Sequence, residues 1–415
     1  MRIQMILIGS TGDVQPMVLL GEALQKKGHE VSVAAFSAFQ GCVESAGLGF
    51  RPLPGDAERF IGSIIQPGKH ALSYLPRLLE ALDHMVTPLF DAIFSYCQDA
   101  DAMLCTFFGN IPHAMAKKLR IPFIEVCYCP MYPTGENSLP ILSPMHLGKH
   151  YHRATYQLAH FLIRQVEKRY LYAWCEEKGI DPQAASARTR LILNAYSAHL
   201  AKKPADWSDN MRLVGFIQPP PAPYAPSEAL QRFLTAGDTP VYIGFGSMTS
   251  GDTQKTVCAV QAAVENLGIR AVIAPGWSGL QADTLPENLF LLEEYVPHDW
   301  IFAKVRAVIH HGGAGTTCAG LCAGKPTLVI PFGSDQYFWG SRVQALGCGP
   351  KALPYTKLTG KRLTKKIQDL LETPRYAKNA KALAALLQKE DAVQDTVTLI
   401  EEKLQGFKKA PQTSA

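Results

Sequence analysis

The chain has 415 residues, more than one ordinary hydrophobic core accommodates, so two domains are expected. Hydrophobic residues make up 47% of the sequence and charged residues 19%, a balance typical of globular proteins in water. The formal net charge of +5 is modest and no long basic run occurs, which argues against nucleic acid as a partner. A phosphate-bearing ligand accounts for this charge equally well.

Targeting signals and cysteine usage point to the cell interior. No apolar run reaches the roughly 18–20 residues that a membrane span needs. The start, MRIQMILIGSTGD, superficially resembles a signal peptide, but it enters a Gly-rich turn without a cleavage site, so it is interpreted as a first strand. The ten cysteines form no CxxC pair and indicate free thiols in a reducing cytoplasm. A cytoplasmic protein is expected, with a peripheral membrane contact left open.

Short β-rich runs alternate with helical patterns in the first half of the chain. Between the first two strands, DVQPMVLLGEALQKKGHE has helical periodicity, and Gly28 is expected to end that helix. Two longer segments, 56–100 and 135–180, are largely helical in pattern and interrupt the alternation. Strands are expected near 3–8, 30–35, 102–105, 122–127 and 190–194.

The second of these helical segments carries an apolar stripe at helical spacing. Core-facing packing is the simpler interpretation of the stripe. A wall of an apolar acceptor pocket or a membrane-surface contact is the alternative. The stripe consists of Ala154, Leu158, Phe161, Leu162 and Val166.

The segment QPPPAPYAP, residues 218–226, can neither pair in a sheet nor continue a helix, so it predicts a stiff linker between domains. The strand–helix alternation then resumes with strands at VYIGF, RAVIA, LFLL, AVIH and TLVIP. Such alternation predicts an α/β fold of doubly wound, mostly parallel sheets, whose carboxyl ends face a ligand-binding cleft. The expected parts are a first domain at 1–217, a linker at 218–238 and a second domain at 239–390.

The stretch HHGGAGTT, residues 310–317, lies where strand AVIH becomes a helix. Glycines there let the backbone approach a ligand closely, and a helix start presents unpaired N–H groups and the positive end of the helix dipole. The pattern predicts an anion site, most naturally for phosphate, with a purely structural turn as the alternative. The glycines are Gly312, Gly313 and Gly315, and the side-chain donors are His311, Thr316 and Thr317.

The phosphates expected here do not match the two commonest nucleotide motifs. The G-x-G-x-x-G spacing of dinucleotide-binding folds is absent, both here and after the first strand. No G-x-x-x-x-G-K-[ST] loop occurs either. The sequence therefore favours neither NAD nor ATP bound in a P-loop.

Four stretches carry a resemblance to a known family. EYVPHDWIF, HHGGAGTT and PFGSDQYFWGSRVQALGCGP resemble the donor-binding signature of GT-B glycosyltransferases of the UDP-glycosyltransferase superfamily. They are most similar to sterol 3-β-glucosyltransferases and to bacterial enzymes that glycosylate macrocyclic and glycopeptide antibiotics. GSTGDVQPMVLLGEALQKKGHEV resembles the N-terminal motif of the same enzymes. The resemblance implies two Rossmann-like domains facing a cleft. A C-terminal helix at about 376–405 would cross back to brace the first domain, so that residues 391–415, the end of the helix and the tail, return to it.

The resemblance implies a diphosphate site at the histidine–glycine turn. His311 would contact the diphosphate beside Gly313, Ala314, Gly315, Thr316 and Thr317. An imidazole and a helix terminus can stabilise the charge that grows on a nucleoside diphosphate leaving group. No metal and no cofactor other than the UDP-sugar co-substrate is therefore expected. Ser247 in GFGSM would be a second phosphate contact, with a simple turn as the alternative.

The nucleoside would lie along YVPHDW. Val296 would offer its backbone to uracil and His298 would pack near the nucleoside. Trp277 in APGW would border the same pocket, with core packing as the alternative. Ala319 stands where plant relatives carry a glutamate for the ribose, which leaves the choice between UDP and dTDP open.

Three further residues match positions that act on the sugar and the acceptor. Asp335 and Gln336 match the pair that hydrogen-bonds sugar hydroxyls, although Asp335 is equally suited to cap a helix. Asp13 follows the first strand and matches the aspartate proposed as base in the sterol and antibiotic enzymes. Its alternative role is a helix cap.

The resemblance implies an inverting, metal-independent transferase that moves a hexose, with UDP-glucose as the favoured donor, to a hydroxyl of an apolar acceptor. A sterol, another lipid or a natural-product aglycone would fit. A membrane-surface glycolipid or cell-wall transferase and a dTDP-sugar-dependent antibiotic transferase are the alternatives. A nucleotide-sugar-binding protein without activity is the alternative from a different class.

Overall fold

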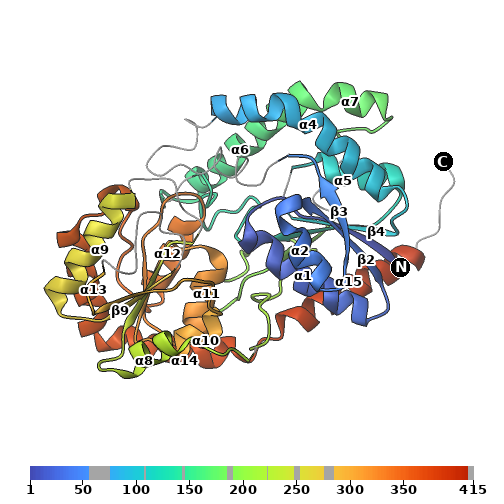
Figure 1. The fold of residues 1–415 in the computed structure, drawn as a ribbon. Helices are drawn as coiled ribbons and strands as arrows, with labels where there is room; N and C mark the ends of the chain where they lie inside the picture. Colours follow the sequence, from blue (N-terminus) through green and yellow to red (C-terminus); the bar gives the residue numbers. More distant parts are fainter. Residues whose placement is uncertain are drawn as a thin grey trace.

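The computed structural model describes residues 1–55, 75–106, 109–142, 145–184, 190–221, 223–246, 253–274 and 285–409, with the backbone alone at 75–84, 253 and 408–409. Two parallel sheets lie side by side, each with helices on both faces (Figure 1). The predicted α/β class is confirmed.

The first sheet has seven parallel strands in the order β3-β2-β1-β4-β5-β6-β7. All five strands expected from the first half are present. Two others were not expected: β3 contains Pro52, and β7 has only three residues, so neither gives a clear strand pattern. The strands are β1 Arg2–Ile6, β2 Glu30–Phe36, β3 Gly49–Leu53, β4 Ala102–Thr106, β5 Phe123–Cys127, β6 Leu191–Asn194 and β7 Met211–Leu213.

Helices of the first half cover both faces of this sheet. The first of them ends where Gly28 takes a positive φ of 86°, as expected from the sequence. The expected helical segments at 56–100 and 135–180 contain α4, α6 and α7, whereas residues 56–74 lie outside the described part. The helices are α1 Thr11–Lys26, α2 Gln40–Ser45, α4 Leu75–Cys97, α5 Ile111–Leu119, α6 Lys149–Tyr170 and α7 Tyr172–Glu177.

The second sheet has five parallel strands in the order β10-β9-β8-β11-β12, and all five were expected. Its strands are β8 Val241–Gly244, β9 Ala271–Ile273, β10 Leu289–Leu291, β11 Val308–His310 and β12 Thr327–Val329. Its helices are α8 Glu228–Thr235, α9 Thr253–Leu267, α10 His298–Ala303, α11 Ala314–Cys322, α12 Gln336–Ala345 and α13 Gly360–Glu372. The expected linker at 218–238 therefore includes α8, and the domain boundaries stay a prediction.

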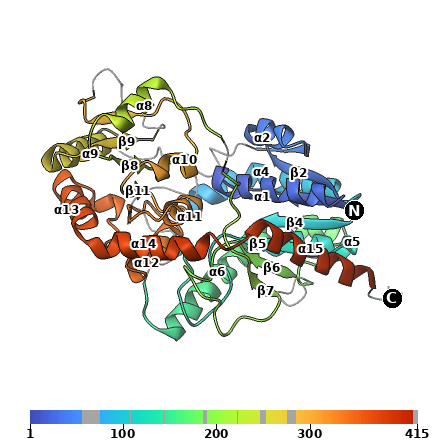
Figure 2. The same cartoon turned by 90° about the horizontal axis from the view of Figure 1, so that it is seen from below.

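The C-terminal segment returns to the first sheet, as expected. Helix α14, Pro374–Leu387, belongs to the second half, and α15, Ala392–Lys409, lies along the first half next to α1 (Figures 1 and 2). Val397, Ile400 and Leu404 of α15 are buried in the core of the first sheet. The single helix expected at about 376–405 is thus two helices, separated at 388–391, where Glu390 accepts a hydrogen bond from Ser197 Oγ at 2.6 Å.

Most of the apolar stripe on α6 does not face the core, so core-facing packing was the wrong interpretation. Phe161 is 58% exposed, Leu158 is 43% exposed and Ala154 is also exposed. The buried face of α6 carries polar residues such as His152 and Glu167 instead. No helix in the described ranges is both long and apolar enough to cross a bilayer. All ten cysteines are free thiols and most are buried.

Candidate functional site

Both sheets reverse their strand order next to their first strand, between β1 and β4 and between β8 and β11. In open parallel sheets, ligands bind outside the carboxyl ends of the strands at this reversal. The loop after β1 leads to Asp13, and the loop after β11 holds His311. Asp13 and the turn that holds His311 therefore follow strands at the reversal points of the two sheets.

The turn between β11 and α11 requires glycine at its centre. Gly312 has a φ of 98°, and a Cβ there would come within 2.5 Å of the Val329 side chain and 3.0 Å of the Gln336 carbonyl oxygen. The preceding His310 is fully buried, and its Nδ1 accepts a hydrogen bond from the Gly312 N–H at 2.9 Å. His310 shapes the turn, although the sequence pattern pointed to no role for it.

Helix α11 begins at this turn with an open N-terminus. Gly313 is the N-cap and offers no side-chain cap, so the first N–H groups of the helix have no partner within it. Gly315 is exposed, and a Cβ on it would meet no atom within 4 Å. The Thr317 hydroxyl is buried and donates to the Gly313 carbonyl at 2.8 Å. That proton is therefore engaged inside the helix, whereas Thr316 is partly exposed.

His311 lies in the loop after β11, and its ring packs against the loop after β8. A Cβ on Gly246 would come within 3.2 Å of its ring, and one on Gly313 within 2.6 Å. Burial, with a smaller contribution from His298, lowers the pKa of His311 to about 4. The imidazole is therefore neutral at neutral pH and has one N–H to donate. Its Nδ1 is buried and has no hydrogen-bond partner among the described residues.

His298 begins α10 and is held by aromatic side chains. It stacks on Phe302 with ring centroids 4.6 Å apart and contacts the edge of Tyr242 at 6.1 Å. Burial lowers the pKa of His298 to about 4, so this ring is neutral as well. Val296 precedes it with its side chain buried. The structure thus brings His298 near His311, as the expected nucleoside and diphosphate positions require.

Asp335 and Gln336 lie at the start of α12, directly against the β11–α11 turn. The Asp335 carboxylate accepts a hydrogen bond from Trp339 Nε1 at 3.0 Å. The Gln336 amide oxygen accepts from the N–H groups of Phe332 at 2.7 Å and of Gly333 at 3.3 Å. Any ligand contact of this amide must therefore come from its nitrogen. Ser334 has a positive φ of 54°, a conformation that is rare outside glycine and aims the chain into this corner.

Asp13 does cap its helix, which was the alternative role considered for it. Its Oδ2 accepts hydrogen bonds from Ser10 N at 2.7 Å and Ser10 Oγ at 2.9 Å. Gly9 has a positive φ and leaves room for the carboxylate, since a Cβ there would collide with it. Burial raises the pKa of Asp13, and the two bonds from Ser10 lower it by less. Because both bonds go to Oδ2, the cap leaves Oδ1 for another role.

The Asp13 and Asp335 carboxylates, which come from different halves of the chain, lie close enough for the charge of one to affect the other. Burial and then the charge of Asp13 raise the pKa of Asp335 to about 6. Cys129, two residues after β5, lies near both carboxylates. After burial, the charges of Asp335 and Asp13 raise the pKa of its thiol. The candidate site therefore brings together charged groups from both halves of the chain. Ser247 and Trp277 lie outside the described residues, so their positions stay predictions.

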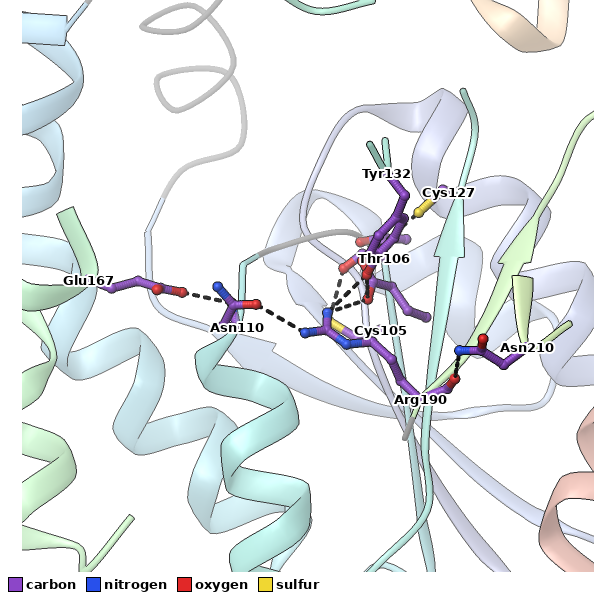
Figure 3. Close-up of polar contacts among 9 residues, drawn as sticks. Cys105, Thr106, Asn110, Cys127, Tyr132, Glu167, Arg190 and Asn210 are labelled. Atoms are coloured by element: carbon purple, nitrogen blue, oxygen red, sulfur yellow. Dashed lines mark hydrogen bonds and ion pairs between the residues drawn. The ribbon is translucent and has the colours of Figure 1, made fainter. Parts of the chain in front are cut away.

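A buried polar network in the first half was not found from the sequence. Arg190 pairs with Glu125 at 2.8 Å, and their side chains are only 4% and 1% exposed (Figure 3). Arg190 also donates to Tyr132 Oη at 2.9 Å and to Asn110 Oδ1 at 3.0 Å, and Glu167 accepts from Asn110 N at 2.7 Å. The network connects β5, the start of α5 and α6, which are far apart in sequence.

Surface shape alone does not single out this candidate site. A cavity of about 700 Å³ opens beside α12 and α13, lined by Tyr337, Ser341, Lys351 and Arg362 among others. None of the predicted site residues lines it. The assignment of the site rests on strand order and on the residues that converge there.

Two family models match the chain, one in each half. Residues 3–136 match the glycosyltransferase family 28 N-terminal domain, and residues 260–403 match the C-terminal domain of erythromycin biosynthesis protein CIII-like proteins. The spinosyn rhamnosyltransferase SpnG is 21% identical, with a TM-score of 0.70 over 97% of this chain and all of that one. The glycosyltransferase of kitacinnamycin is 18% identical, with a TM-score of 0.72 over 97% of this chain and 99% of that one. The fold is therefore GT-B.

Curated relatives extend the match over the whole chain. The Arabidopsis thaliana sterol 3-beta-glucosyltransferase UGT80B1 is 30% identical over all of this chain and 70% of its own length. The sterol 3-beta-glucosyltransferase UGT80A2 of the same plant is 33% identical over 96% of this chain and 64% of its own length. The chain belongs to this family of glycosyltransferases, which includes sterol glucosyltransferases and bacterial natural-product glycosyltransferases. It spans about two thirds of the length of these two plant relatives.

Proposed function

We propose that this glycosyltransferase moves glucose from UDP-glucose to a hydroxyl of an apolar acceptor with inversion at the anomeric carbon. The observation that carries the proposal is the approach of Asp13 and Asp335, from opposite halves of the chain, beside an open helix N-terminus. A transfer reaction needs an acceptor-side base and a donor-side sugar contact at one point, and these two carboxylates meet that need.

The donor diphosphate would bind at the start of α11. The N–H groups of Ala314, Gly315 and Thr316 would donate to it, with His311 donating from the side. A neutral imidazole suits this role, since it needs only one N–H to stabilise charge developing on the departing UDP. The same groups supply the positive potential that a metal ion would otherwise provide, so the proposed transfer is metal-independent.

The rest of the donor would extend from this point in two directions. The uracil and ribose would lie along Val296 and His298, where the stacked His298 and Phe302 rings form one wall. The glucose hydroxyls would face Asp335 and the amide nitrogen of Gln336. Ser247 and Trp277 are proposed as further donor contacts on the grounds of the family motif alone.

Asp13 is the proposed base. The acceptor hydroxyl would give its proton to Oδ1 while its oxygen forms a bond to the anomeric carbon and the bond to the β-phosphate oxygen breaks. A raised pKa makes a carboxylate a better base, because it brings the proton affinity closer to that of the group losing the proton. The bonds from Ser10 to Oδ2 would hold the carboxylate in one orientation during this transfer.

The acceptor is proposed to be a sterol, another lipid or an apolar aglycone. The exposed Leu158 and Phe161 on α6 offer an apolar surface on the acceptor half. Two plant relatives are named as sterol glucosyltransferases. A dTDP-sugar donor is the second candidate, because Ala319 supplies no acidic partner for a ribose hydroxyl that only UDP carries.

One set of measurements separates these candidates. UDP, dTDP and NAD should be compared for thermal stabilisation, since a ligand that binds the folded state raises the melting temperature. Transfer should then be assayed from UDP- and dTDP-sugars to sterol, phenolic and macrolide acceptors. Stabilisation by UDP together with transfer to a sterol supports the proposal. Stabilisation by UDP without transfer to any acceptor indicates a binding protein, and preference for dTDP favours the second candidate.

A further inference from the structure

Trp339 holds the carboxylate of Asp335 from within the same helix. Its Nε1 donates to Asp335 Oδ2 at 3.0 Å, and its backbone N–H donates to the Asp335 carbonyl at 3.1 Å. The indole is fully buried, so it cannot exchange this bond for one with water. A carboxylate held at one oxygen by a rigid ring has a fixed direction, which a sugar-reading group needs.

The other side of the same indole contacts the first half of the chain. Its ring lies 5.7 Å from that of Tyr196, which follows β6, and 5.8 Å from that of Phe216, which follows β7. One turn later, Arg342 Nε donates to the Leu200 carbonyl at 2.7 Å. The face of helix α12 that carries Trp339 therefore packs against the first half and hydrogen-bonds to it.

We propose that Trp339 is a positioning residue that makes the orientation of the sugar-reading carboxylate depend on the packing between the two halves. The indole N–H sets the direction of Asp335, and Tyr196 and Phe216 set the position of the indole. The inference rests on the proposed function, because it assumes that Asp335 contacts the donor sugar. It adds that sugar discrimination is controlled from outside the donor-binding half.

The charges around Asp335 give this arrangement a measurable signature. The hydrogen bonds from Trp339 and Ser334 lower the pKa of Asp335 and oppose burial and the charge of Asp13, which raise it. The Cys129 thiol also faces it from the end of β5. Losing the indole N–H would therefore raise this pKa, and activity that needs ionised Asp335 would fall at a higher pH.

The test compares Trp339→Phe with the wild-type chain. Phenylalanine keeps an aromatic ring between the halves, and it removes the N–H donor together with the five-membered ring that carries it. The preference for UDP-glucose over UDP-galactose, as a ratio of kcat/KM values, should fall roughly tenfold, the usual order for a hydrogen bond to a charged group. The acidic limb of the pH–rate profile should move to higher pH, while UDP binding stays within about twofold.

Two further variants separate positioning from general packing. Phe338→Leu removes a neighbouring ring on the same helix, which lies 4.9 Å from Trp339 and has no bond to Asp335. It should lower the melting temperature and leave the sugar ratio and the acidic limb in place. Tyr196→Leu changes a residue of the first half that packs on the indole, and it should lower the sugar ratio in the same direction as Trp339→Phe.

The outcomes are distinct. A folded Trp339→Phe with unchanged sugar ratio and acidic limb overturns the inference, as does an equal loss of sugar ratio in Phe338→Leu. Should Trp339→Phe not fold, Tyr196→Leu decides through the same two readings. An inactive wild-type chain would overturn the proposed function instead. In that case the hydrogen bond from the indole can still be tested by NMR titration of the Asp335 carboxyl group. If the pKa of Asp335 in Trp339→Phe, or in Tyr196→Leu, equals that in the wild type, the inference is refuted.

Discussion

Asp13 and Asp335 lie in different halves of the chain, and yet burial and then the charge of Asp13 raise the pKa of Asp335 to about 6. Placing two carboxylates within reach of each other is unfavourable for folding. Such a pair is therefore expected where function requires it or where nearby hydrogen-bond donors stabilise the charges. Each carboxylate has its own hydrogen-bond donor, Ser10 for Asp13 and Trp339 for Asp335, which holds it in one orientation.

This relationship predicts that Asp335→Asn stabilises the protein at neutral pH. A folded-state pKa raised from 3.8 to about 6 means that ionising Asp335 costs more in the folded chain than in the unfolded one. The penalty is absent below about pH 4, builds up as the pH rises to about 6 and stays constant above. The shift corresponds to at most on the order of 3 kcal/mol. Asparagine carries no such penalty and keeps an oxygen for the Trp339 bond.

Melting temperatures of Asp335→Asn and the wild type at pH 4 and pH 8 test this point. The difference between the two proteins should favour the variant and be larger at pH 8. Transfer from UDP-glucose should fall, because the amide accepts hydroxyl protons less strongly than a carboxylate. A gap in melting temperature that does not change with pH would show that Asp335 ionises as easily in the folded chain as in the unfolded one.

Asp13→Asn should reduce transfer by roughly 10²–10⁴-fold, the usual contribution of a general base. Asparagine keeps an oxygen that can accept both bonds from Ser10, so the helix cap and the fold should survive. Affinity for UDP, bound by the other half, should hardly change. The assay needs a hydroxyl acceptor, because a thiol ionises near neutral pH without help. Near wild-type transfer in a folded variant would falsify the base assignment.

The parallel sheets could be predicted because their strands are short apolar runs bounded by glycine and proline, as in AVIH and TLVIP. The positions of His311, Gly313 and Asp335 followed from the same logic, since residues after parallel strands meet at one edge. Strand β7 could not be predicted, because three residues, one of them the exposed Arg212, give no clear period. At the break between α14 and α15, Glu390 accepts a hydrogen bond from Ser197 in the other half, a contact that no local pattern records.

The side chains that support the site were hidden for the same reason. Glu125 lies in an apolar strand, and only the fold shows that Arg190 neutralises it. From the sequence, Trp339 is indistinguishable from an ordinary core residue. Only the structure shows that its indole N–H donates to the Asp335 carboxylate. On α6 the wrong face was assigned to the core. The apolar stripe suggested that it packs inward, but the buried face carries polar residues such as Glu167, which accepts a hydrogen bond from the Asn110 N–H at the start of α5.

His311→Ala should lower transfer by roughly 10²–10³-fold, the usual loss when one donor to a developing negative charge is removed. UDP affinity should fall as well. Since the pKa of His311 is about 4, the imidazole stays neutral between pH 6 and 8, and the loss should be the same across that range. Turnover and UDP affinity at both ends of the range test this. If His311→Ala lost transfer activity only near pH 6, the protonated imidazolium would be the form that stabilises the departing UDP.

Transfer should survive chelation. The proposed diphosphate site has the N-terminus of α11 and His311 to supply positive potential. Rates after dialysis against EDTA should match those with added Mg²⁺ or Mn²⁺. Complete loss of activity that either metal restores would contradict metal-independent transfer.

Gly315→Ala should separate stability from function. A Cβ at this position meets no protein atom within 4 Å, and alanine favours a helix over glycine by up to about 1 kcal/mol. The melting temperature should therefore stay or rise. If the diphosphate lies against this stretch of backbone, the added methyl group occupies the space that its oxygens need, and the KM for UDP-glucose should rise at least tenfold.

Gly406 of α15 is the matched control, because it too is an exposed helical glycine with open space at the Cβ position, and it lies in a helix that contributes no predicted site residue. Gly406→Ala should raise the melting temperature by a similar amount and leave the KM unchanged. If both substitutions are kinetically silent, the diphosphate does not approach Gly315. If Gly315→Ala raises the KM while melting no earlier than Gly406→Ala, the glycine is present for the ligand and not for the fold.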